Sequence, residues 1–151
     1  MKKNLQSAAL IVAIALATPA MAQFKNAEDT IKYRKSVFAV MGQHFSQIGA
    51  MVNGRVPFDA QKAKEDAALV MSLGRLPWRA FGADTDLGDT KAKPEIWQEQ
   101  AKFKAAADKA MGELSKLEAA TKTGNIDQIK AAFGAAGQSC KACHDNYKKK
   151  Y

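Results

Sequence analysis

Both cysteines of this 151-residue chain lie near its C-terminal end, in the run Cys140-Lys141-Ala142-Cys143-His144. A Cys-x-x-Cys-His run is the attachment pattern of a c-type haem, in which each thiol forms a thioether to the porphyrin and the histidine binds the iron. On a helix, side chains at positions i, i+3 and i+4 share one face, so a short segment can hold a flat cofactor by its edge and its centre. The run therefore predicts one covalent haem c, with Cys140 and Cys143 as anchors and His144 as axial ligand.

Three other uses of two cysteines fit this chain less well. A thioredoxin-like dithiol needs its first cysteine at a helix N-terminus in a βαβ unit, whereas no segment here shows the alternation of a strand. A zinc site needs four ligands, and the only other histidine, His44, is expected to point to solvent or to the flank of its helix. A disulfide between cysteines three positions apart would close a tiny loop and add little stability.

The first residues have the pattern of an export signal. Lys2 and Lys3 precede an unbroken apolar run over residues 10–17, and Ala20-Met21-Ala22 supplies a cleavage site of small residues. The run is shorter than the roughly 20 residues that span a bilayer, so a retained membrane anchor is the less favoured alternative. The sequence predicts that residues 1–22 are removed and that residues 23–151 form one exported domain.

The mature chain is mildly basic. Without the two lysines of the signal it has 21 Lys and Arg against 15 Asp and Glu, which gives a formal charge of +6. It has no arginine-rich arm, zinc-finger spacing or alternation of basic and aromatic residues, so a nucleic-acid partner is not expected. Such a charge suits an anionic partner or simple solubility.

Four segments carry apolar residues at alternating intervals of three and four, which is the spacing of an amphipathic helix. Each begins at a residue that suits a helix start: Asn26, Asp59, Pro94 and Asn125. The first three end at turn-forming residues: Asn53-Gly54, Gly74 with Pro77, and Thr123-Gly124. The second segment is predicted to bury a face made of Ala63, Leu69, Val70, Leu73 and Leu76.

The apolar stripe of the last segment contains both cysteines: Ile126, Ile129, Phe133, Ala136, Cys140, Cys143 and Tyr147. Gly134 and Gly137 make the middle of this helix slim, which favours either a flat group against the backbone or close helix packing. Residues 77–93 are polar and rich in turn formers, except for Trp78 and Phe81, which are expected to fold back onto the core. The pattern as a whole predicts an all-α, antiparallel four-helix bundle.

Four short motifs occur in a characteristic order along the chain: Lys32-Tyr33-Arg34, then Leu76-Pro77-Trp78 with Phe81, then Pro94-Glu95-Ile96-Trp97, then the haem motif close to the C-terminus. Over essentially the whole mature chain the sequence resembles cytochrome c′, a family of exported four-helix-bundle haem proteins of bacteria. The resemblance implies a periplasmic homodimer, commonly packed through its first two helices. It also implies a five-coordinate iron with an empty distal face that binds nitric oxide and often carbon monoxide, with electron transfer to an unidentified periplasmic partner as a further role.

The first helix supplies the two residues that decide the coordination of the iron. Phe38 matches the family position that covers the distal side, where an apolar side chain without a hydrogen-bond donor excludes water. The alternative is that Phe38 is an ordinary core residue. Met41 lies one turn further along the same stripe, and a methionine thioether is a known sixth ligand of low-spin cytochromes. If Met41 is instead core filler, the iron stays five-coordinate.

Four further residues are candidates for contact with the haem. Arg34 interrupts the apolar stripe of the first helix, where a guanidinium can pair with a haem propionate unless it is simply solvated. Trp78 and Phe81 are expected to wall the edge of the haem or to cover the end of the bundle. Lys148 lies one turn after His144, where the family carries a basic residue beside the proximal pocket. Lysine keeps that charge without the planar fork of arginine, and the alternative is a solvated tail lysine.

Three function classes compete on this sequence. The first is a periplasmic gas-binding haem protein that is not an enzyme, because no acid–base pair or nucleophile accompanies the haem motif. The second is a six-coordinate, low-spin bundle cytochrome that only carries electrons. The third is an exported dithiol oxidoreductase, which would keep both thiols free of porphyrin. The chain favours the first.

Overall fold

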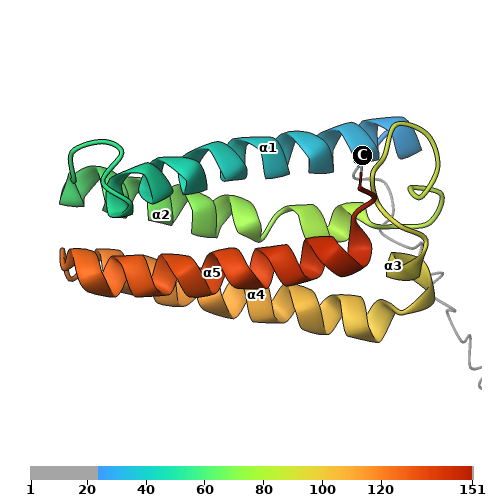
Figure 1. Cartoon of the computed structure of the whole chain (residues 1–151). Coiled ribbons are helices and arrows are strands. Elements are labelled where there is room, and N and C mark those ends of the chain that lie inside the picture. The colour runs from blue at the N-terminus through green and yellow to red at the C-terminus, as the bar shows by residue number, and fades with distance from the viewer. Residues whose placement is uncertain (1–23, 151) are drawn as a thin grey trace, which may run out of the picture.

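The computed structural model describes residues 24–150, so the predicted signal at residues 1–22 lies outside the described residues. The helices within this range are α1 (Ala27–Val52), α2 (Ala60–Gly74), the 3-10 helix η1 (Pro77–Ala80), α3 (Glu95–Gln98), α4 (Gln100–Thr121) and α5 (Ile126–Tyr147). The four long helices run alternately up and down, with α1 packed on α2 and α5, and α4 packed on α5 and α2 (Figure 1). The predicted all-α, antiparallel four-helix bundle is thus confirmed.

The helix starts form as the sequence predicts. The Asn26 side chain accepts a hydrogen bond from Asp29 N at 2.8 Å, and the Asp59 side chain accepts one from Lys62 N at 2.9 Å. Asn125 caps α5 by accepting from two backbone N–H groups, each at 3.0 Å. Each such cap stabilises its helix by about 1 kcal/mol, because it satisfies donors that have no partner within the helix.

The third predicted helix is not continuous. Its first turn is the separate helix α3, and the chain leaves helical geometry at Glu99, with φ −118° and ψ 45°, before α4 begins. Trp97, within α3, donates a hydrogen bond from Nε1 to the carbonyl oxygen of Gly82 at 2.8 Å. This contact anchors α3 to the long loop after η1, while α4 packs in the bundle, so the two parts follow different directions.

The bundle has a packed half and a hollow half. Eight buried residues form a core that extends from the end where α1 leads into α2 and α4 leads into α5 to the cavity, which Val70 and Leu114 also line: Ile48, Val52, Ala67, Val70, Leu114, Leu117, Ile129 and Ala136. Ile48, Leu117 and Ile129 are fully buried, and such a side chain contributes roughly 1.5–3 kcal/mol to folding.

The buried face of α2 differs from the prediction in two places. Leu69 is 44% exposed instead of buried, whereas Asp66, whose charge argues against burial, is fully buried. Asp66 Oδ1 lies 2.7 Å from Nδ1 of His44 on α1 and 3.1 Å from Nζ of Lys62. His44 was expected to point to solvent or to the flank of its helix, and the structure shows the second, with a half-buried ring turned toward this carboxylate. Within residues 24–150, no helix is both long enough and apolar enough to cross a membrane.

Candidate functional site

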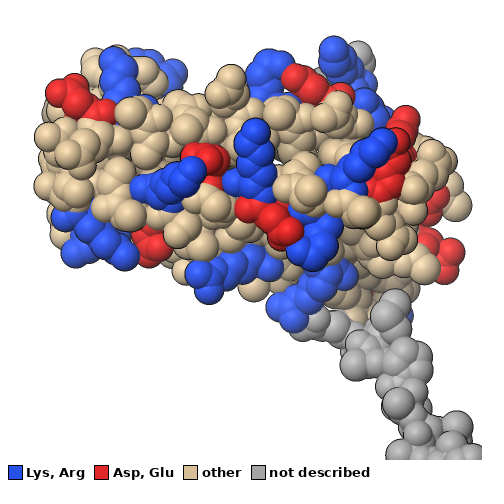
Figure 2. Space-filling view, turned by 90° about the horizontal axis from the view of Figure 1, so that it is seen from below, with Lys and Arg blue, Asp and Glu red and all other residues tan. Residues whose placement is uncertain are grey.

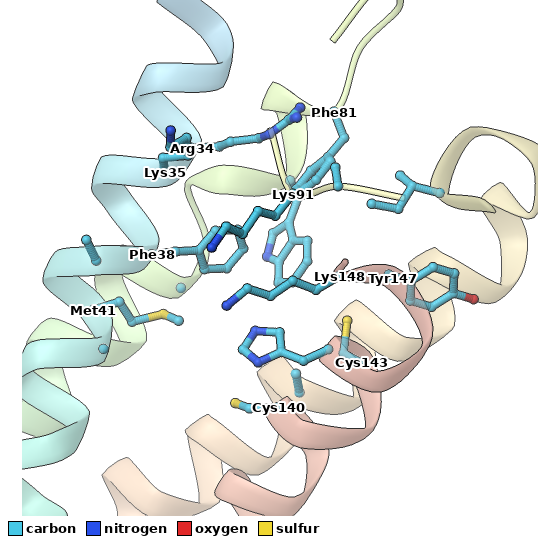
Figure 3. A pocket seen from close by; sticks show the side chains of 18 of the residues that line it. Arg34, Lys35, Phe38, Met41, Phe81, Lys91, Cys140, Cys143, Tyr147 and Lys148 are labelled. Atoms are coloured by element: carbon cyan, nitrogen blue, oxygen red, sulfur yellow. The ribbon is translucent and has the colours of Figure 1, made fainter. Parts of the chain in front are cut away.

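The hollow half of the bundle contains a cavity of about 540 Å³, a size typical of pockets for small molecules and cofactors. Phe38 and Met41 of α1 face Cys140 and Cys143 of α5 across it (Figure 3). All nine residues that the sequence singled out line this one cavity: Arg34, Phe38, Met41, Trp78, Phe81, Cys140, Cys143, His144 and Lys148. They come from three parts of the chain: α1, the segment that follows α2, and the C-terminal part of α5. Only the fold brings these parts together.

The α5 wall presents the haem-attachment motif on one helix face. Cys140 and Cys143 are half-buried and form no disulfide with each other, and burial raises the pKa of each thiol. Burial, and then the positive charge of Lys148, lowers the pKa of His144. The imidazole is therefore neutral at pH 7, which is the form that ligates a metal ion. One side of the cavity therefore carries two thiols that can form thioethers to a haem and an imidazole that can bind its iron.

The opposite wall is apolar and built from α1 and aromatic neighbours. The ring of Phe38 packs edge-on against Trp78, with ring centroids 6.0 Å apart, and lies 6.4 Å from Phe81. A Cβ placed on Gly74 would lie 3.6 Å from Sδ of Met41, so the thioether packs against the end of α2. Phe81 and Phe103 continue the aromatic wall at 4.9 Å, and Tyr147 of α5 meets Phe103 at 5.2 Å. Trp78 and Phe81 thus fold back onto the bundle as predicted.

Arg34 is buried, so the alternative of a solvated arginine is wrong, while contact with a propionate stays a prediction. It is 3% exposed, and burial lowers its pKa to about 10. Its Nη1 donates to Ala80 O and Thr85 Oγ1, each at 2.9 Å, and its Nη2 donates to Thr85 O and Thr90 Oγ1, each at 2.6 Å. The guanidinium also lies 4.6 Å from the centre of the Phe81 ring. With every terminal N–H group engaged, Arg34 organises the loop after η1, and contact with a propionate would require one of these bonds to change partner.

The wall of the cavity is mostly apolar, with a few polar and charged side chains. Within the described residues, the buried indole N–H of Trp78 has no hydrogen-bond partner. Three lysines also line the cavity: Lys35, Lys91 and Lys148. A haem has a flat apolar ring, two carboxylates at one edge and an iron at its centre. Apolar walls, a spare donor, lysines and an imidazole suit this group.

Sequence reasoning missed the contribution of the loop before α3. Lys91 and Ala92 line the cavity, and they belong to a segment without periodicity, so no pattern indicates their position. Phe45 and Phe103 also line it, and they lie on the apolar stripes of α1 and α4, where the sequence indicates only burial. Lys148 ends α5 and forms an isolated antiparallel bridge with Ala92, which brings the loop over the cavity.

The alternatives of zinc and dithiol chemistry find no support in this arrangement. Over residues 24–150, no group of three or more His, Cys, Asp or Glu is placed to hold a metal ion. The same residues contain no β-strand apart from the isolated bridge between Ala92 and Lys148, so the cysteines are not part of a βαβ unit.

Comparison with known proteins decides the family. The family model described as Cytochrome C' matches residues 29–148. The chain belongs to the cytochrome c′ family. It is 50% identical over 129 residues to cytochrome c′ of Rubrivivax gelatinosus, covering 85% of this chain and 100% of the relative. It is 44% identical over 128 residues to cytochrome c′ of Alcaligenes xylosoxydans xylosoxydans, covering 85% and 99%.

Solved structures of cytochrome c′ have the same fold. The crystal structure of the Rubrivivax gelatinosus protein matches with a TM-score of 0.82 at 50% identity, covering 84% of this chain and 100% of that chain. A nitric oxide complex of a mutant cytochrome c′ from Alcaligenes xylosoxidans matches with a TM-score of 0.80 at 42% identity, covering 85% and 100%. Membership of the cytochrome c′ family implies a haem c cofactor in this chain, and the family is typically exported.

Proposed function

We propose that this chain is a periplasmic haem protein that binds nitric oxide and carbon monoxide at a five-coordinate iron. One haem c would be held by thioethers from Cys140 and Cys143, with a ring nitrogen of His144 on the iron. When bound, the haem supplies an iron centre with affinity for diatomic gases and for an electron. The observation that carries the proposal is the asymmetry of the cavity: an imidazole with two thiols on the α5 wall faces apolar side chains of α1.

The apolar wall favours ligands that need no hydrogen bond. Phe38 offers no donor or acceptor, and its contacts with Trp78 and Phe81 hold it at the cavity. Water and dioxygen gain stability from a polar neighbour, whereas nitric oxide and carbon monoxide bind ferrous iron strongly without one. In this proposal Phe38 excludes water and leaves the distal position open to small gases.

The alternative of a six-coordinate electron carrier depends on Met41. Its sulfur packs at the end of α2, beside Gly74, which supports a packing role and not ligation. A gas-binding protein with this site can also exchange electrons, so we include electron transfer as a second role. Binding and electron exchange need no acid–base pair, and we propose no enzymatic reaction.

A ligand titration tests the coordination state. Ferrous protein purified with its haem should bind carbon monoxide and nitric oxide with large changes in the visible spectrum. Met41→Leu should leave the spectrum of the unliganded protein unchanged, because leucine fills the same volume without a sulfur. A low-spin spectrum that ignores both gases, and that becomes high-spin in Met41→Leu, would establish the six-coordinate alternative instead.

A second variant, at Phe38, tests whether this side chain covers the distal position. Phe38→Ala should speed carbon monoxide binding, since it removes the side chain that covers the distal position. Unchanged association kinetics in Phe38→Ala would show that the side chain is a core residue with no distal role.

Intact mass should show the mature chain from Gln23 plus one haem. Free thiols at Cys140 and Cys143 would favour the dithiol alternative.

The oligomeric state is part of the proposal. Val40 on α1 is 49% exposed and Leu69 on α2 is 44% exposed, and Val56 in the connection between these helices is 46% exposed. These apolar side chains support a homodimer packed through α1 and α2, in which they would be removed from water.

A further inference from the structure

Two segments that are far apart in the sequence pair beside the cavity. Lys93 N donates to Tyr147 O at 3.0 Å, and Lys149 N donates to Lys91 O at 2.8 Å. Ala92 and Lys148 form the antiparallel bridge between these bonds. We call residues 91–93 together with residues 147–150 the lysine clamp. Figure 1 shows the C-terminal end of the chain lying against the loop before α3, where the clamp forms.

The lysine clamp concentrates positive charge. Five of its seven residues are lysines and none is acidic: Lys91, Lys93, Lys148, Lys149 and Lys150. Lys93 Nζ donates to the carbonyl oxygens of Asp145 and Asn146, each at 3.0 Å, and so completes the C-terminal end of α5. Lys149 and Lys150 are exposed beside it. The pairing therefore adds the charges of two short segments into a single patch.

Two acidic residues near the lysine clamp form ion pairs with lysines outside it. Asp145 accepts a hydrogen bond from Lys141, and Asp89 accepts one from Lys35, so each already has a cation of its own outside the clamp. Those contacts are the main cause of the lowered pKa of both carboxyl groups, and the clamp lysines Lys91 and Lys150 lower the pKa of Asp89 and Asp145, respectively, by a smaller amount. On the surface shown in Figure 2, in contrast, acidic and basic residues are interspersed. Typical of the helices are local pairs such as Lys104 with Asp108 and Lys116 with Glu113.

The clamp lies where its charge can act on a protein that exchanges electrons with the haem. Lys91 and Lys148 both line the cavity and extend across it, so the clamp is part of the wall around the candidate haem (Figure 3). Electron transfer between proteins weakens steeply with distance, so a partner docked here would lie close to the haem edge. A positive patch at such a point attracts and orients a partner with negative surface charge.

We propose that the lysine clamp is the docking surface for an acidic electron-transfer protein. This inference rests on the proposed function, because it assumes a haem in the cavity. An anionic membrane surface would also attract lysines, but membrane-bound segments pair basic residues with apolar side chains that enter the lipid. The large exposed apolar residues of the described chain all lie outside the clamp: Val40, Val56, Leu69, Leu87 and Ile126. The clamp is thus better suited to a polar protein surface.

Electron exchange with charged reagents measures the field at the clamp. Ferrous protein with its haem is oxidised by hexacyanoferrate(III), an anion, or by tris(phenanthroline)cobalt(III), a cation, at several salt concentrations. The double variant Lys149→Glu/Lys150→Glu should slow the anionic reagent about tenfold at low salt and speed the cationic one, with both effects fading as salt rises. These two lysines do not line the cavity, so carbon monoxide binding should be unchanged.

The matched control is Lys64→Glu/Lys130→Glu, which makes the same change in net charge at exposed positions near the N-terminal ends of α2 and α5, in the packed half of the bundle. Its effect on either reagent should be less than about twofold, because the charges are far from the cavity and screened. Equal effects from the two double variants would mean that net charge alone matters, and would overturn the proposal. Loss of gas binding in the unmodified protein would instead refute the proposed function.

Docking itself is tested with an acidic polypeptide as the probe. Poly-L-glutamate added to the carbon monoxide complex should shift amide NMR signals of residues 91–93 and 147–150, and Lys149→Glu/Lys150→Glu should abolish these shifts. Shifts spread over all exposed lysines, or no shifts, would contradict the proposal. Salt-sensitive binding to phosphatidylglycerol vesicles that the same variant abolishes, without shifts from poly-L-glutamate, would reassign the clamp to a membrane surface.

Discussion

Two charged side chains, Asp66 and Arg34, are buried in this bundle, and their effect on stability can be measured. Asp66 is fully buried, yet only Oδ1 is engaged, by His44 and Lys62, while Oδ2 has no partner among the described residues. A buried carboxylate is costly unless it is paired, and its removal leaves His44 and Lys62 without their shared partner. Because His44 and Lys62 reach solvent at one side, the cost of removal is smaller than for a fully enclosed pair.

Substitution of Asp66 should separate charge from hydrogen bonding. Asp66→Ala should lower the free energy of unfolding by about 2 kcal/mol, since it removes both contacts and leaves a small void. Asp66→Asn keeps an oxygen for His44 and removes the buried charge, so it should stay within about 1 kcal/mol of the unmodified protein. Urea unfolding midpoints measure both. Glu65→Ala, an exposed neighbour, is the control, and equal midpoints for Glu65→Ala and Asp66→Ala would contradict the expectation.

Arg34 is the second residue whose role depends on burial. Arg34→Met should lower the free energy of unfolding by about 3 kcal/mol, because it leaves the buried oxygens of Ala80 and Thr85 without their donor. Hydrogen exchange should rise in residues 80–90 before it rises in the helices. The alternative, a role confined to a haem propionate, predicts a changed redox potential with normal exchange protection in that loop.

At the scale of whole helices, glycines set how closely the elements approach. A Cβ on Gly49 of α1 would lie 2.6 Å from Cζ of Phe133 on α5, and that ring is stacked on Phe45 with centroids 4.4 Å apart. Gly134 and Gly137, for which the sequence left open a flat group or close helix packing, differ from each other: only Gly137 lies against a neighbouring helix, at Phe45. Neither lines the cavity, a Cβ on Gly134 would meet nothing within 4 Å, and one on Gly137 would contact only Phe45. The close approach of backbone to an aromatic ring is at Gly49.

Two alanine substitutions test this difference. Gly49→Ala should lower the free energy of unfolding by about 1–3 kcal/mol, because the stacked Phe133 and Phe45 rings must move. Gly134→Ala should raise it by roughly 0.5–1 kcal/mol, because alanine favours the helix and meets no neighbour. Thermal or denaturant unfolding of the two variants in parallel gives the result. A stabilised Gly49→Ala would show that the rings move without cost.

At the scale of the whole molecule, the exposed apolar side chains of α1 and α2 predict how copies associate. Leu69→Lys should convert the proposed dimer to a monomer, since it places a charge within a face that would be desolvated. Leu87→Lys is the control, because Leu87 is 72% exposed in the loop before α3. Sedimentation velocity over a range of protein concentrations measures the change. If both variants keep the same mass as the unmodified protein, the face of α1 and α2 is not the interface.

Local sequence determined the helices and the chemistry of α5. Spacings of three and four and side-chain caps at Asn26, Asp59 and Asn125 are properties of short segments, so they indicate the elements without knowledge of their neighbours. The order of Cys140, Cys143 and His144 likewise places three groups on one helix face by helix geometry alone. These predictions succeeded because each depends on residues within a few turns of one another.

Only the tertiary structure decided how distant segments meet. Arg34 became the donor for a loop about 50 residues away, Asp66 became buried because His44 lies opposite it, and residues 91–93 paired with the end of α5. No local spacing indicates such contacts, because they depend on the packing of one helix against another and on the course of an irregular loop. The sequence by itself therefore established a helical bundle with a haem-attachment motif, while the cavity and the lysine clamp beside it arise only when the chain is folded.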